Sequence, residues 1–145
     1  MRQFKPKRDL SQFKLAFLIL IPIIILIAIL SDSWQEAVLV NTIISALLIS
    51  MLLIIMYTTS YKIDGEFLRY RSFFLFGKVS ISDIRQLEVG KTMYVGIKPA
   101  TAKHGIIVRY NRYDEIYISP ENNQEVVQAL LEINPNIEVV DYTEK

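Results

Sequence analysis

Two long apolar runs dominate the first part of the chain. The first covers residues 15–30 (LAFLILIPIIILIAIL), and the second covers residues 37–56 (AVLVNTIISALLISMLLIIM). A helix needs about 20 apolar residues to cross the hydrocarbon core of a bilayer, and the second run reaches that length unaided. Flanking residues extend the first run to about 13–31, because Lys14 can reach toward the headgroups. The pattern predicts a transmembrane helical hairpin over residues 15–56.

A cleaved signal peptide is the alternative interpretation of residues 1–30, since it shares a basic start and an apolar middle. No small-residue cleavage site follows the first run, only AILSDS, and the second run comes at once. Cations lie on the terminal side of the hairpin: five precede it, Lys62, Arg69 and Arg71 are the first to follow it, and the connecting segment SDSWQE has none. The positive-inside rule therefore predicts that both termini are cytoplasmic and that the loop around Trp34 is external.

The second run also carries a small residue at every fourth position, at Thr42, Ala46 and Ser50. Such a stripe lets two helices approach closely in lipid. We expect it to pack against the first span, with a partner protein or self-association as the alternative. Neither run contains a charged side chain, which indicates an anchor rather than a transport pathway.

From residue 57 onward the apolar period changes to two residues, as is typical of strands. YKIDGEFLRYRSFFLF (61–76) predicts two strands around an Asp64-Gly65 turn, with Ile63 opposite Glu66 and the hairpin ending at Gly77-Lys78. Alternation gives one face to the core and mixes cations with aromatics on the other. The expected core face holds Tyr61, Ile63, Leu68, Tyr70, Phe74 and Phe76. The expected opposite face holds Lys62, Phe67, Arg69, Arg71, Phe73 and Leu75.

The remaining strands and one amphipathic helix complete the predicted domain. Strands are expected within 79–89, broken by a turn at Ser82-Asp83, and at 92–97, 106–110 and 115–119, with a loop over 98–105. The helix is expected to have Ser119 as its N-cap, Pro120 at its first position, and Asn134-Pro135 as its end. Its apolar stripe is Val126, Val127, Leu130, Leu131 and Ile133.

Six or seven antiparallel strands avoid exposed edges by curling into a barrel or an orthogonal sandwich that a helix plugs. That is the architecture of a pleckstrin-homology (PH) fold. The predicted fold class is an N-terminal transmembrane α-hairpin followed by a mainly-β PH-like barrel or sandwich capped by one C-terminal helix. The predicted parts are a basic cytoplasmic N-terminus (1–14), the hairpin (15–56), the PH-like domain (57–140) and a tail (141–145). We expect residues 57–145 to fold without the anchor.

Several motifs of the domain resemble a known family. These are SISDIRQLEV, KPAT, the strand end YISP (117–120), Gln124-Glu125 with Leu130, and NPNI (134–137). Together they resemble the bacterial PH-domain family of the YyaB-like type, formerly a domain of unknown function, which includes two-span membrane-anchored members. The resemblance implies the fold and an anchored bacterial membrane protein. A related membrane-anchored PH-like group includes an immunity protein against an antimicrobial peptide, but no shared motif carries that role over.

The composition excludes several kinds of chemistry. Residues 57–145 hold 11 cations and 12 anions, whereas binding of long nucleic acid needs a basic stripe. The chain has no cysteine, one histidine (His104, expected in a loop), no glycine-rich phosphate loop and no metal-ligand spacing. Asp114 and Glu115 are adjacent, so on a strand they point to opposite faces. We therefore expect no catalytic residue, no cofactor and no metal.

Lys62, Arg69 and Arg71 are the candidate binding residues, for acidic lipid headgroups. The expected function is a membrane-tethered, non-catalytic cytoplasmic binding module that contacts the bilayer and a membrane or envelope protein partner. The alternative is an immunity or envelope-protection factor against a membrane-active peptide. An enzyme or a transporter is the third class, which the missing site disfavours.

Overall fold

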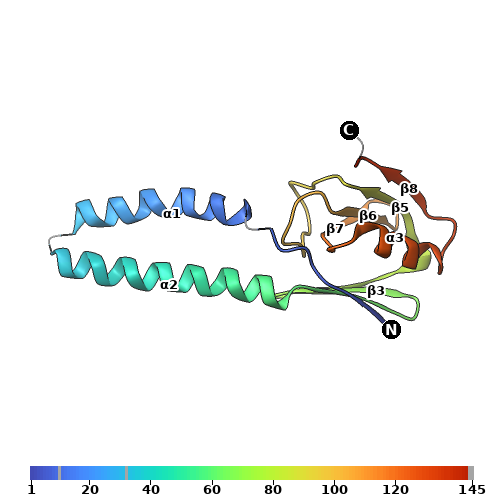
Figure 1. Cartoon of the computed structure of the whole chain (residues 1–145), viewed down its shortest axis with the longest axis horizontal. Coiled ribbons are helices and arrows are strands. Elements are labelled where there is room, and N and C mark those ends of the chain that lie inside the picture. Colours follow the sequence, from blue (N-terminus) through green and yellow to red (C-terminus); the bar gives the residue numbers. More distant parts are fainter. Residues whose placement is uncertain (10, 32, 144–145) are drawn as a thin grey trace. The chain divides into compact units, whose positions relative to one another are not determined.

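The computed structural model describes residues 1–9, 11–31 and 33–143, with only the backbone described for 11–13, 15 and 16 (Figure 1). Leu10, Asp32 of the expected external loop and the last two residues of the expected tail lie outside this description. The chain divides into two compact units. Leu10–Tyr57 form a helical unit, and Met1–Asp9 join Thr58–Lys145 in a second, mainly β unit.

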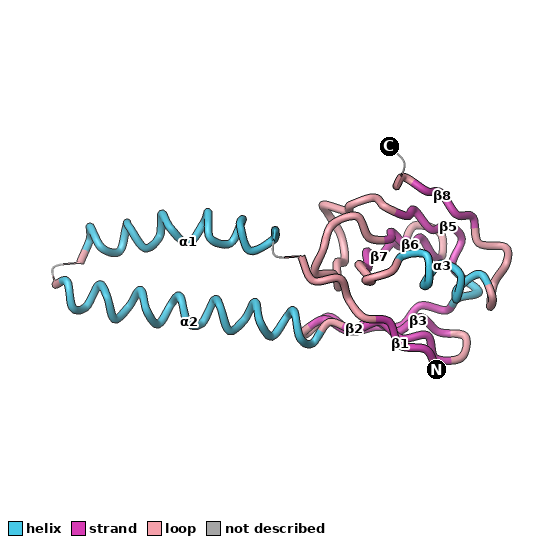
Figure 2. Tube along the Cα trace, viewed as in Figure 1, coloured by secondary structure: helices cyan, strands magenta, loops and turns pink. Residues whose placement is uncertain are grey.

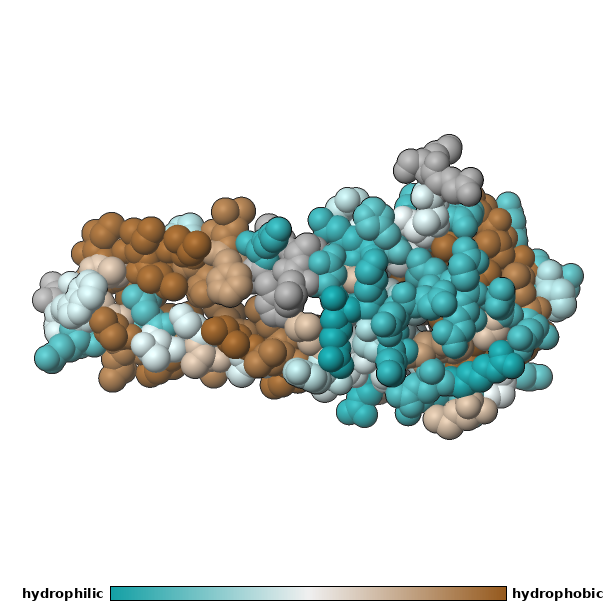
Figure 3. All heavy atoms as spheres, viewed as in Figure 1, coloured by the Kyte–Doolittle hydropathy of each residue, from teal (hydrophilic) through white to brown (hydrophobic). Residues whose placement is uncertain are grey.

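The helical unit consists of α1 (Ser11–Leu30), which contains Pro22, and α2 (Trp34–Thr58). Most of its large side chains are exposed, and hydrophobic residues cover both helices in Figure 3. Among the described residues α2 is long and apolar enough to cross a membrane, whereas the apolar stretch of α1, Phe17–Leu30, is shorter.

The first sheet of the β unit has four antiparallel strands in the order β1-β2-β3-β4. They are β1 (Arg2–Phe4), β2 (Ser60–Asp64), β3 (Phe67–Ser72) and β4 (Leu75–Ser80). Strand β1 was not predicted, because a three-residue strand leaves too little alternation to recognise. It precedes the helical unit in the chain, yet it pairs with β2, which follows that unit, with Arg2 opposite Ile63 (Figure 2).

The predicted β2–β3 hairpin is confirmed, but its turn lies one residue later than expected. Ile63 pairs with Leu68 rather than with Glu66, and Gly65-Glu66 form the two-residue turn. Gly65 has φ +60, which suits the first central position of a type II′ turn. The predicted faces of β2 and β3 survive, because the pairing shifts by two residues and side chains alternate with a period of two.

A second tight turn, at Phe73-Phe74, corrects the faces predicted beyond Ser72. Strands β3 and β4 pair Ser72 with Leu75 and Arg71 with Phe76, so Gly77 and Lys78 lie within β4 instead of ending the hairpin. The predicted core positions of Phe74 and Phe76 are wrong, since these side chains are 72% and 78% exposed. Leu75 likewise shares the face of Ser72 rather than that of the cations. Because the turn has two residues, the even-numbered side chains of β3 face the core, whereas in β4 the odd-numbered side chains do.

The second sheet has the order β7-β6-β5-β8. Its strands are β5 (Ile84–Val89), β6 (Ile106–Tyr110), β7 (Asp114–Ile118) and β8 (Glu138–Asp141). The expected turn at Ser82-Asp83 is a short 3-10 helix, Ile81–Asp83. The all-antiparallel prediction is wrong for β8, which pairs in parallel with β5. The strand expected at 92–97 is also absent there: apart from a bridge between Ile97 and Ile116, the segment is a loop.

Helix α3 (Asn123–Leu131) begins later than predicted. Its N-cap is Asn122, whose side-chain oxygen accepts hydrogen bonds from the backbone N–H groups of Gln124 and Glu125. The predicted cap, Ser119, is instead fully buried, and its hydroxyl accepts from the backbone N–H groups of Thr101 and Ala102. Ser119 therefore fixes the 90–105 loop rather than the helix.

One buried cluster joins both sheets, α3 and the N-terminal strand. Its central members include Phe4, Leu68, Ile81, Leu87 and Leu130. Val126, Val127 and Leu130 of the predicted helical stripe are buried, whereas Ile133 is 41% exposed. A mainly β unit with two sheets and one helix that shares their buried cluster agrees with the predicted class, while β8 follows the helix that was expected to be the last element.

Candidate functional site

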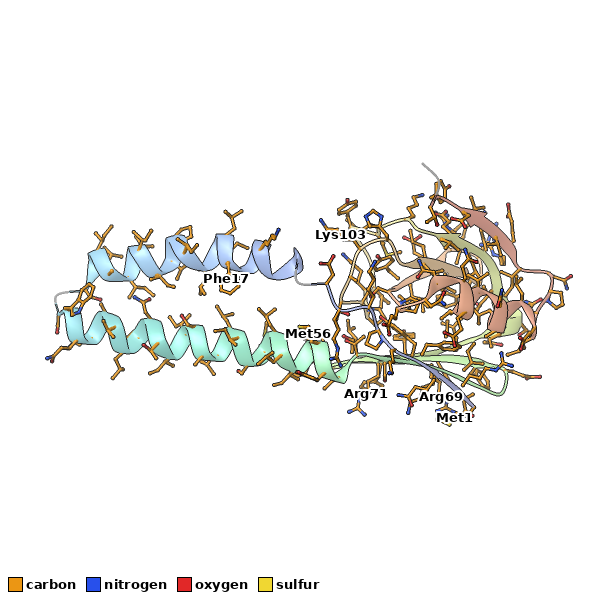
Figure 4. The ribbon with its side chains drawn as sticks, in the orientation of Figure 1. Met1, Phe17, Met56, Arg69, Arg71 and Lys103 are labelled. Atoms are coloured by element: carbon orange, nitrogen blue, oxygen red, sulfur yellow. The ribbon has the colours of Figure 1, made fainter. Side chains whose placement is uncertain are left out.

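The three predicted cations lie together on the outer face of the first sheet. Strand pairing sets Lys62 opposite Arg69 and Arg69 opposite Lys78, and it sets Arg71 opposite Phe76. Figure 4 shows the Arg69 and Arg71 side chains on one side of the β unit, pointing away from its core. These residues line an open depression of about 410 Å³, here called the basic groove. Its lining is Ser60, Lys62, Arg69, Tyr70, Arg71, Phe76, Gly77 and Lys78.

Lys78 and Phe76 were missed as groove residues. The signal for them was the alternation of Leu75–Ser80, which continues past Gly77-Lys78 once Phe73-Phe74 is recognised as a turn. Gly77 belongs to the groove floor because the Tyr70 ring lies over it: a Cβ at Gly77 would approach Tyr70 Cζ to 2.6 Å. Any side chain at position 77 would therefore displace that ring.

The four groove cations differ in how far they are already paired. The Arg69 guanidinium lies 3.2 Å from an Asp64 carboxylate oxygen, at an exposed pair, and Lys78 Nζ lies 4.8 Å from the centroid of the Phe67 ring. Within the described residues no carboxylate lies within 4.0 Å of Lys62 or Arg71. The groove therefore carries a net positive charge that an anion can neutralise.

The groove begins close to the end of α2 along the chain. Thr58 is the last residue of α2 and also belongs to the β unit, and Lys62 follows only four residues later. Four extended residues span at most about 14 Å. The two neighbouring threonines are tied to the β3–β4 turn, because Thr58 Oγ1 accepts from the Phe73 N–H at 2.9 Å and Thr59 Oγ1 lies 2.8 Å from Ser72 Oγ.

The Phe73-Phe74 turn, here called the aromatic turn, exposes two large apolar side chains. Phe73 is 39% exposed and Phe74 is 72% exposed, and their rings stack edge to face with centroids 5.1 Å apart. Phe73 has φ +48, a left-handed conformation that costs an L-residue about 1–2 kcal/mol. Asparagine and glycine are the usual residues at such a position, so an aromatic pair here is unusual for a turn in water.

The predicted small-residue stripe lies on the surface of the helical unit. Thr42, Ala46 and Ser50 are all exposed, and the Thr42 and Ser50 hydroxyls donate to backbone carbonyls of α2 itself. Thr42 and Ala46 line one wall of a depression of about 540 Å³ that Ile24 and Ala28 of α1 also line. The Asn41 amide of α2 donates to the Ile24 carbonyl of α1 at 3.3 Å, and Ala37 of α2 is buried.

The residues considered for catalysis do not form a reactive group. His104 is exposed, with its Nδ1 3.3 Å from the Gly90 carbonyl oxygen. Asp114 accepts from the Asn111 amide, and Glu115 lies 4.0 Å from Arg109. Among the described residues no three histidine, cysteine or carboxylate side chains gather in a cluster suited to a metal ion.

Two buried tyrosines have structural roles. Tyr61 donates to the Pro99 carbonyl at 2.6 Å and accepts from the Ser119 N–H at 3.1 Å. Tyr117 donates to the Ala102 carbonyl and accepts from the Gly105 N–H, both at 2.9 Å. Burial raises the pKa of Tyr61 to about 12 and raises the pKa of Tyr117 as well. Both phenols therefore stay neutral near pH 7 and hold the 90–105 loop against the sheets.

Glu88 forms a second polar cluster, on the outer face of the second sheet. It is 5% exposed, and its two carboxylate oxygens lie 2.8 Å from Lys91 Nζ and 2.8 Å from an Arg109 guanidinium nitrogen. The hydrogen bond from Lys91 to Glu88 raises the pKa of Lys91. Two cations therefore compensate one buried carboxylate, as burial of a charge requires.

The two-sheet β unit with one packed helix and an open basic surface defines the class of small PH-type binding domains. A family model described as "Bacterial PH domain" matches residues 59–134. The chain belongs to the bacterial PH domain family. No curated protein matches it, and no solved structure matches it.

Proposed function

We propose that this chain is a membrane-tethered, non-catalytic binding module of the bacterial cytoplasmic membrane, which holds acidic lipid headgroups in the basic groove. The observation that carries the proposal is the position of an open groove with four cations so few residues beyond the end of α2. Each cation near an anionic membrane surface contributes about 1 kcal/mol of attraction. A protein partner at the same groove is the competing outcome of the test below.

The N-terminal strand supports two crossings of the membrane. Strand β1 precedes the helical unit, yet it folds together with the segment that follows that unit. A segment that starts and ends in one folded unit crosses a bilayer an even number of times. Since α2 suffices for one crossing, α1 supplies the other, and its 20 residues rise about 30 Å. Two spans before a PH domain, with the YISP and NPNI motifs, also favour the YyaB-like subgroup.

The proposed topology predicts which positions are reachable from outside the cell. The chain has no native cysteine, so a cysteine at Ser33, between α1 and α2, should react with a membrane-impermeant maleimide in intact cells. A cysteine at Arg112, an exposed residue of the β6–β7 turn, should react only after permeabilisation, because the cations flank the hairpin on that side. Labelling of Arg112→Cys but not of Ser33→Cys in intact cells would reverse the orientation.

Headgroup binding predicts a loss of affinity when the two unpaired groove cations are removed. In the full chain in an uncharged detergent, replacing Lys62 and Arg71 with glutamine should weaken binding of a short-chain phosphatidylglycerol by about 30-fold, or about 2 kcal/mol. Added salt should weaken wild-type binding in the same direction. A titration with the lipid, followed by the fluorescence of a Phe76→Trp reporter, measures both effects.

The matched control replaces Lys103 and Arg112, two exposed cations outside the groove, with glutamine. It removes the same charge and should leave the affinity nearly unchanged. An equal loss of affinity in the groove variant and in the control variant would mean that only the net charge of the protein matters. If wild-type protein ignores the lipid at low salt, the headgroup role is wrong, and crosslinking from Phe76 in membranes then tests for a protein at the groove.

A further inference from the structure

The aromatic turn lies at the end of the β unit to which α2 connects. Neither ring belongs to the buried cluster of the β unit, and both are exposed. The Phe73 N–H donates to Thr58 Oγ1, so the turn contacts the last residue of α2 directly. A hydrogen bond 2.9 Å long thus ties the turn to Thr58, the first residue of the β unit after the helical unit.

If α2 spans a bilayer, its last residues lie at the boundary between hydrocarbon and headgroups. Tyr57, next to Thr58 in the chain, is 70% exposed and is the kind of residue found at that depth. Phenylalanine side chains at the same depth bury apolar surface without losing a hydrogen bond. The next residue pair beyond Ser72 and Leu75 is Arg71 and Phe76, so a cation follows the aromatic turn directly along the hairpin. The order of apolar tip and then cations matches the order of layers in a bilayer leaflet.

We propose that the aromatic turn, Phe73 and Phe74, inserts into the interface of the membrane that α2 crosses and holds the β unit against the lipid surface. This contact rests on the proposed tether but not on headgroup binding in the groove. Insertion explains why the turn carries two phenylalanines although its left-handed backbone suits glycine or asparagine better. The free energy gained when the rings are buried in lipid favours aromatic residues at these positions. The tether and the turn together fix the domain at two points.

The test places a single tryptophan reporter in the full chain, reconstituted in phosphatidylcholine vesicles without anionic lipid. Trp34 is the only tryptophan, and in a Trp34→Phe background the reporter is introduced by Phe74→Trp. Acyl-chain brominated phosphatidylcholine should quench its fluorescence several-fold more strongly than it quenches a Tyr113→Trp reporter. Its emission should also be blue-shifted.

Tyr113 is the matched control because it is an aromatic residue, 82% exposed, at the other end of the β unit. Its turn is joined to that end by the hydrogen bond from the Asn111 N–H to the Asp83 carbonyl. The Ile81 N–H in turn donates to the carbonyl of Glu66, in the β2–β3 turn. Strands β2 and β3 separate this end from the aromatic turn.

A third reporter, Leu47→Trp in the middle of α2, separates the two proposals. Quenching at Leu47→Trp with none at Phe74→Trp would overturn the insertion while leaving the tether intact. No quenching at Leu47→Trp would overturn the tether itself. Two results together would show that a second copy covers the turn: energy transfer between labelled copies, and no quenching of the Phe74→Trp reporter by brominated lipid. That outcome would also overturn the lipid assignment.

Discussion

Replacing Phe4 with alanine should lower the free energy of unfolding of the β unit by about 3–5 kcal/mol, the usual cost of removing a buried phenylalanine. Phe4 is 5% exposed and belongs to the cluster that joins both sheets, although the whole helical unit separates it in sequence from the other members. Losing its ring leaves a cavity that a three-residue edge strand cannot close. Urea-dependent pulse proteolysis of the full chain in a mild detergent measures the change.

The matched control is Gln3→Ala, because Gln3 lies in the same strand and is exposed. Its change should stay within about 0.5 kcal/mol, as is usual for surface sites. Equal stability of the Phe4→Ala and Gln3→Ala proteins would contradict the place of β1 in the core.

The same reasoning revises the expectation that residues 57–145 fold alone: that segment would lack the hydrogen bonds that Lys5 and Lys7 exchange with Glu121 and Ser119. A synthetic peptide of residues 1–9 should then raise its urea midpoint.

Leu130→Ala should lower the free energy of unfolding by about 2–5 kcal/mol, because this side chain is fully buried between α3 and the two sheets. Its loss removes contacts with both sheets at once, and the short α3 has little means of moving inward to fill the space. The same proteolysis measurement reports the effect. Ile133→Ala, just beyond the helix and 41% exposed, is the control of the same chemistry. A Leu130→Ala change as small as that of the control would show that α3 does not fill the core.

The candidate groove was partly predictable because alternation alone places Lys62, Arg69 and Arg71 on one face. That assignment tolerated a turn misplaced by one residue, since the resulting shift preserves the parity of each strand. Lys78 and Phe76 were not predicted as groove residues, because the Phe73-Phe74 turn contains no glycine or asparagine to mark it as a tight turn. At Ser119 a turn signal was present but misleading. A serine followed by proline before a helix is typical of an N-cap, but Asn122 provides the cap of α3.

The sequence by itself determined the two apolar runs, the charge asymmetry around them, the β2–β3 hairpin and the buried stripe of α3. These features depend on neighbours within a few residues, where periods of two or 3.6 residues and turn chemistry act directly. Only the tertiary structure decided that Arg2–Phe4 pairs with β2, that Glu138–Asp141 pairs in parallel with β5, and that the aromatic turn meets Thr58. Such pairings join short segments far apart in the chain, and their choice depends on which edges and faces remain open once the local elements have packed.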